Sequence, residues 1–152
     1  MSAARPSLNQ MAVAATNHCL TGCAAGEVGG LVLATWWGWG TAASIGLAIG
    51  LAFVFAYGLT LRALARSGLS WLGRIRVAFA ADTVSIVVME TVDNAIVLVV
   101  PGAMTAGLAD PLFWGSLALS LVVAWAVAFP VNRWLLGRGL GHALVTGQHA
   151  AH

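Results

Sequence analysis

The sequence predicts an all-α integral membrane protein, a four-helix bundle with both termini in the cytoplasm. Of the 152 residues, 60% are hydrophobic and only 8% are charged, whereas soluble domains average about 25% charged residues. Four apolar runs each reach the roughly 20 residues that a helix needs to cross hydrocarbon. The basic residues fall only in those segments that four crossings would place on one side of the bilayer.

The four runs define the expected helices. The first extends from Met11 or His18 to Trp37, and the others cover about Thr41–Leu64, Val77–Pro101 and Leu112–Leu136. None shows the strict alternation of a membrane strand. Because backbone amides in lipid must be paired within the segment, long apolar runs predict helices. Pro130 lacks an N–H and is expected to kink or loosen the fourth helix.

Charge distribution predicts the topology. Residues 1–10 form a cytoplasmic segment, 11–138 the transmembrane domain and 139–152 a cytoplasmic tail. The positive-inside rule places both termini on the cytoplasmic side of the inner (plasma) membrane, because every basic residue lies at the termini or between the second and third runs: Arg5, Arg62, Arg66, Arg74, Arg76, Arg133 and Arg138. They form no basic stripe, so no nucleic-acid partner is expected.

Glycines at four-residue spacing mark two helix faces. Gly22, Gly26 and Gly30 lie on the first helix, and Gly46 and Gly50 on the second. Such spacing lets another backbone approach closely. Helix packing and assembly into a homo-oligomer are therefore expected at these faces.

The first helix carries groups that can bind a metal or exchange a proton. Cys19, Cys23 and Glu27 are spaced i, i+4, i+8 and share one side, with His18 adjacent. The cysteines are expected to be free thiols, because a disulfide at this spacing within a helix has poor geometry. Asn17 offers an alternative: as an N-cap it would start the helix at His18 and set Cys19 in the positive field of the helix dipole.

Acidic residues interrupt the third run. Asp82, Glu90 and Asp93 lie on or beside one helix face together with Met89. At 1.5 Å per residue, the His-Cys motif falls near the level of Asp82, and Glu27 near that of Glu90 and Asp93. No basic residue lies in the central part of any run, so the carboxyl groups are expected to be protonated or compensated by a bound cation.

Four stretches resemble a known family: "NHCLTGCAAGE", "AADTVSI", "PLFW" and "FPVNRWLLGRGLGHAL". Together they are similar to domain-of-unknown-function family 4396, a group of small bacterial multi-pass membrane proteins, over residues 12 to 145. The resemblance implies that the family's characteristic positions are His18, Cys19, Gly22, Cys23, Gly26, Glu27, Asp82, Thr83, Pro130, Asn132 and Trp134. It implies no activity.

Function is therefore predicted from the residues. Two thiols and an imidazole suit a soft metal ion, and Cu(I) is favoured over Zn(II). The expected activity is the binding, and in its fuller form the transport, of that ion between the first and third helices. The expected ligands are His18, Cys19, Cys23 and Asp82, and the expected ion or proton path is Glu27, Glu90, Asp93 and Met89.

Weaker features and alternatives remain at this point. His142, His149 and His152 in the tail are weak candidates for metal capture. A single histidine inside the apolar runs disfavours haem. Enzymatic activity is not favoured, but a thiol-redox protein with Cys19 as nucleophile and Cys23 as resolving thiol is an alternative. A non-catalytic structural membrane subunit is another.

Overall fold

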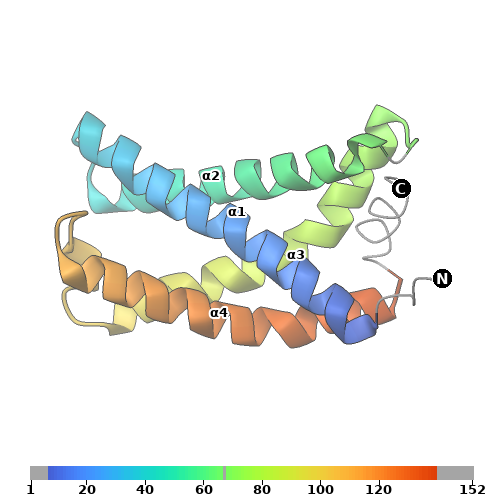
Figure 1. Ribbon diagram of the computed structural model, residues 1–152. Coiled ribbons are helices and arrows are strands. Elements are labelled where there is room, and N and C mark those ends of the chain that lie inside the picture. Colours follow the sequence, from blue (N-terminus) through green and yellow to red (C-terminus); the bar gives the residue numbers. More distant parts are fainter. Residues whose placement is uncertain (1–6, 67, 140–152) are drawn as a thin grey trace.

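Four long helices follow the four apolar runs (Figure 1). The computed structural model describes residues 7–66 and 68–139. Its elements in chain order are α1 (Leu8–Trp37), α2 (Thr41–Ala63), the 3-10 turn η1 (Leu64–Arg66), α3 (Trp71–Val99), the 3-10 turn η2 (Ala103–Thr105) and α4 (Pro111–Gly137). The predicted all-α architecture with four helices is confirmed.

The first helix begins earlier than the apolar run. Ser7 caps α1: its hydroxyl accepts from the Gln10 backbone N–H, and the Gln10 side chain accepts from the Ser7 N–H at 2.8 Å. This reciprocal pair is a capping box. Asn17 consequently lies inside α1, so the alternative in which it caps the helix is wrong. Cys19 lies several turns from the helix start, where the field of the dipole has decayed.

Among the described residues, three helical segments are long and apolar enough to cross a membrane: Leu8–Trp37, Thr41–Arg66 and Pro111–Gly137. The fourth predicted span, α3, is of similar length but is interrupted by charge. Its two arginines lie near its start. Its three acids, Asp82, Glu90 and Asp93, are all buried against the other helices.

The helices alternate in direction, so the start of α1, the α2–α3 connection and the end of α4 share an end of the bundle. Figure 1 shows the start of α1, η1 and the end of α4 at that end. The described arginines all belong to it: Arg62, Arg66, Arg74, Arg76, Arg133 and Arg138. At the opposite end, the connections α1–α2 and α3–α4 lie near exposed tryptophans, Trp36, Trp37, Trp39 and Trp114.

Small residues bring α1 and α2 together. Three glycines of α1 face three alanines of α2, so closely that an added Cβ would collide with backbone atoms: Gly22 against Ala56, Gly26 against Ala52 and Gly30 against Ala48. This is the close backbone approach predicted for the first glycine face. A Cβ on Gly46 or Gly50 would meet nothing within 4 Å. The second glycine face therefore makes no close packing contact with the part of the chain that the structure describes, and homo-oligomer formation stays a prediction.

The interior is small and partly polar, whereas the outer surface is large and apolar. Buried positions are mostly alanine, cysteine, serine and threonine, and exposed positions include many valines, leucines and tryptophans. A soluble bundle would show the reverse. Small residues inside a bundle and apolar residues outside it are typical of helices packed in lipid.

Side-chain hydrogen bonds tie α4 to α1. Asn132 donates to the buried Thr16 hydroxyl at 2.9 Å. The Trp125 indole donates to Asn17 at 2.7 Å, so this tryptophan in the middle of α4 has its polar edge satisfied. α4 continues as a helix past Pro130, so this proline does not end the helix.

Candidate functional site

Polar side chains form two clusters between α1 and its neighbours. The first, here the histidine cluster, consists of His18, Thr60 and Asp82 and lies nearer the arginine-rich end. The His18 Nε2 is 2.9 Å from the Thr60 hydroxyl oxygen, and the imidazole also contacts the Ala56 carbonyl. Asp82 interacts with the same Thr60 hydroxyl, and its buried Oδ2 has no hydrogen-bond partner. His18 and Asp82 thus lie at one level, as the helical rise predicts.

The two cysteines lie in the core of the bundle, and Cys23 faces α3. Both are free thiols, as predicted, with 2% of Cys19 and 1% of Cys23 exposed. Cys23 contacts Cys19 and the carboxyl group of Glu90. Met89 is part of the same buried cluster as the cysteines. The thiol-redox alternative requires an accessible Cys19, and in this structure Cys19 is buried.

The predicted metal ligands are not brought together as one set. His18 and Asp82 meet at Thr60 on α2, whereas Cys23 meets Cys19 and Glu90 of α3. Successive residues on a helix point about 100° apart, so His18 and Cys19 face different neighbours. Within residues 7–66 and 68–139, no three His, Cys, Asp or Glu side chains form a group that could hold a metal ion.

The second cluster, here the acidic cluster, consists of Glu27, Glu90 and Asp93. The carboxyl groups of Glu27 and Asp93 are adjacent, and both interact electrostatically with Glu90. Asp93 also interacts with the Ser120 hydroxyl of α4. Glu90 and Asp93 are only 6% and 7% exposed. The common level predicted for these three acids is confirmed.

Several carboxyl oxygens of the acidic cluster meet no hydrogen-bond donor among the described residues, unless one of the adjacent Glu27 and Asp93 carboxyl groups is protonated and donates to the other. They are both oxygens of Glu27, Oε1 of Glu90 and Oδ1 of Asp93, and all four are buried. The described arginines lie at the far end of the bundle. Buried carboxylates without partners are costly. These acids do not form a group that could coordinate a bare metal ion, so the arrangement is suited to hold a proton, or a cation that brings its own hydrogen-bond donors, such as a hydrated ion or an ammonium group.

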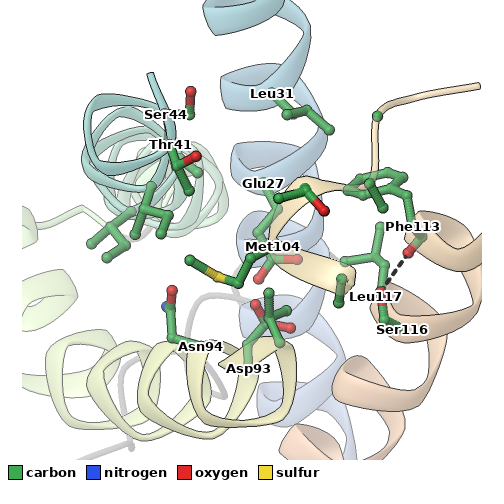
Figure 2. Close-up of a pocket in the computed structure, with 18 of the residues that line it drawn as sticks. Glu27, Leu31, Thr41, Ser44, Asp93, Asn94, Met104, Phe113, Ser116 and Leu117 are labelled. Atoms are coloured by element: carbon green, nitrogen blue, oxygen red, sulfur yellow. Dashed lines mark hydrogen bonds between the residues drawn. The ribbon is translucent and has the colours of Figure 1, made fainter. Parts of the chain in front are cut away.

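A cavity of about 440 Å³ extends from the acidic cluster to the α1–α2 connection at Trp39 and Thr41. Figure 2 shows Glu27 and Asp93 close together beside Met104, with Phe113 and Leu117 on one side. Residues from all four helices and η2 form its wall. No motif in the sequence predicts this cavity.

Two partners of the candidate residues were also missed. Thr60 and Ser120 are fully buried hydroxyls on α2 and α4. Their signal was available, because each is a hydroxyl residue inside a strongly apolar run. The tail candidates His142, His149 and His152 lie outside the described residues.

The sequence pattern of the family described as Domain of unknown function (DUF4396) matches residues 8–141. The chain belongs to the DUF4396 family. The family predicted from the sequence motifs is thereby confirmed. No curated protein and no solved structure matches the chain. For this DUF4396 protein, function must be argued from the two polar clusters and the cavity.

Proposed function

We propose that this DUF4396 protein is an integral membrane protein that binds a cation at the acidic cluster in exchange for protons. The observation that carries the proposal is the set of buried, unpartnered oxygens on Glu27, Glu90 and Asp93 at the base of a cavity. A charge at such a position is costly unless a counter-charge is present. Protons and a bound cation are the two ways to supply it, and the cavity gives a cation access.

The proposed placement is in the plasma membrane with both termini cytoplasmic. Arginines gather at one end of the bundle and exposed tryptophans at the other, which fits the positive-inside rule and an interfacial aromatic belt. The cavity then opens on the outer side. The histidine cluster lies beyond the acidic cluster, toward the cytoplasm, and Cys23 beside Glu90 lies between them. We propose this series of groups as the path for transfer.

Labelling with dicyclohexylcarbodiimide tests the proposal. This apolar reagent reacts with protonated carboxyl groups in apolar surroundings, and intact-mass spectrometry counts the adducts. Purified protein should gain an adduct that is absent from the E27Q/E90Q/D93N triple variant. A cation that binds the cluster should suppress the adduct, and Na⁺, K⁺, Mg²⁺, Zn²⁺ and small ammonium ions are tested in turn.

D110N is the matched control. Asp110 is exposed and caps α4 by accepting from the Leu112 N–H at 2.9 Å, and asparagine caps a helix equally well. This variant removes an acid outside the cavity and should label like the wild type. Labelling that persists in the triple variant, or that no cation suppresses, would contradict the proposal.

A second candidate function is binding of a soft metal ion such as Cu(I). It is favoured by Cys19, Cys23 and Met89, which share one buried cluster, with the Glu90 carboxyl against Cys23. Thiolate and thioether sulfurs suit Cu(I). The ligand set would then differ from the one predicted from sequence, because His18 is engaged with α2.

Metal analysis separates this candidate from the first. Protein reconstituted with Cu(I) under reducing conditions is compared with a C19S/C23S variant by elemental mass spectrometry. Near-stoichiometric copper in the wild type and none in the variant is the expected result. Equal copper in both proteins would place the metal elsewhere and refute the thiol site.

A further inference from the structure

The cavity above the acidic cluster is too large and too apolar for a bare ion. Its volume of about 440 Å³ falls in the range of small-molecule sites, roughly 300–1,000 Å³. Most of its wall is apolar, contributed by Leu31, Ile45, Ile49, Val97, Phe113 and Leu117. An inorganic cation would leave this surface wet, whereas a ligand with an apolar body would cover it.

Three hydroxyl groups of the cavity wall present acceptors rather than donors. The hydroxyl hydrogens of Ser44, Thr105 and Ser116 are used in bonds to the backbone carbonyls of nearby residues, at 3.0, 3.1 and 3.0 Å. Their remaining capacity is the oxygen lone pairs. These three hydroxyls complement a ligand that donates hydrogen bonds, although Asn94 in the same wall keeps one amide N–H beyond its bond to the Glu90 carbonyl.

The carboxyl groups at the base of the cavity also favour a positively charged ligand. Glu90 and Asp93 are each more than nine-tenths buried, and each has one carboxyl oxygen without a partner. Glu27 adds two further buried oxygens whose neighbour is the Asp93 carboxyl group. A primary ammonium group carries three N–H donors and one positive charge, and so could donate to all three carboxyl groups at once.

We infer that the cavity binds a small primary amine in its protonated form, with the ammonium group on the acidic cluster and the apolar body along the wall. This inference rests on the proposed function, since it names the class of cation. Entry of the ammonium ion releases one proton from the carboxyl groups to water, so that the net charge of the site is unchanged. Trp39, about half exposed at the outer end of the cavity, would offer a ring face to the entering cation.

Isothermal titration calorimetry of detergent-purified protein with benzylamine tests the inference. Benzyl alcohol has nearly the same shape and no charge, and methylamine has the charge without the apolar body. Benzylamine should bind about tenfold or more tightly than either, because hydrogen bonds to charged groups and ring burial each contribute about that factor. In two buffers of different ionisation enthalpy, the measured heats should differ as expected for one released proton.

The D93N variant should bind benzylamine about tenfold or more weakly, and D110N should match the wild type. If D93N does not fold, the comparison of the three ligands on the wild-type protein still decides. Equal binding of benzylamine and benzyl alcohol would show that the cavity takes apolar molecules without regard to charge, and would overturn the inference. If benzylamine fails to bind while an inorganic cation suppresses carbodiimide labelling, the inference falls and the proposed function stands. If benzylamine does not bind and no inorganic cation suppresses labelling, the inference and the proposed function are both refuted.

Discussion

Replacement of Gly26 by alanine should separate α1 from α2, and Gly50→Ala is its matched control. Both glycines lie inside helices, so both substitutions bring a similar gain in helix propensity, about 0.5–1 kcal/mol. They differ in what the new methyl group meets. At Gly26 it meets the backbone N and Cα of Ala52, and at Gly50 it meets nothing within 4 Å.

The size of the expected destabilisation follows from the kind of atom that the new methyl group meets. Backbone atoms cannot rotate away as a flexible side chain can, so the two helices must move apart by up to about 1 Å. A gap of that size forfeits about a quarter to a half of the energy of each dispersion contact along the interface. Overpacking of this kind costs about 1–3 kcal/mol. We expect Gly26→Ala to be less stable than Gly50→Ala by an amount in the upper half of that range.

Equilibrium unfolding in mixed detergent micelles, followed by circular dichroism, measures both variants against the wild type. Because the gain in propensity cancels between the two, their difference in unfolding free energy isolates the packing term. Equal stabilities, within about 0.5 kcal/mol, would refute the α1–α2 register. A Gly50→Ala variant that is the less stable of the two would point to a close contact at the outer face of α2.

Three further outcomes are expected. Thr16→Val, which removes the acceptor of the Asn132 bond, should lower the unfolding free energy by about 1 kcal/mol, and the same unfolding assay measures it. Trp125→Phe, which removes the donor to Asn17, should cost about 0.6 kcal/mol, and an Asn17→Ala variant should then add little further loss. The buried thiols of Cys19 and Cys23 should react with maleimide only after unfolding in dodecyl sulfate; modification of the folded protein at the rate of the unfolded chain would contradict their burial.

Much of the fold follows directly from the sequence. The apolar runs predict four helices, and the helical rise predicts that Glu27 lies level with Glu90 and Asp93. That placement needs only two helices running in the same direction. α1 starts at Leu8, before both predicted starts, Met11 from hydropathy and His18 from an Asn17 cap. The Ser7–Gln10 capping box was a readable signal outside the apolar run.

The candidate site was less predictable, because periodicity gives the relative angle of two residues and not the neighbour that each one faces. His18 was grouped with Cys19, its neighbour in the chain, yet it bonds to Thr60 of α2. Gly46 and Gly50 have the same spacing as the glycines of α1, yet a Cβ at either position would meet no described residue within 4 Å. The cavity depends on side chains from all four helices and η2, and no local pattern specifies such an arrangement.

Difference infrared spectroscopy of the reconstituted protein directly tests the exchange of protons for a cation at the acidic cluster, because it detects the carboxyl groups themselves. Spectra are recorded on membranes perfused alternately with and without a cation that suppresses carbodiimide labelling. Cation binding should remove a protonated-carboxyl C=O band and add carboxylate bands. Both changes should be reduced in Glu27→Gln and Asp93→Asn and retained in Asp110→Asn. A spectrum with no carboxyl change on cation binding, or one that persists undiminished when Glu27, Glu90 and Asp93 are all replaced, would contradict this exchange.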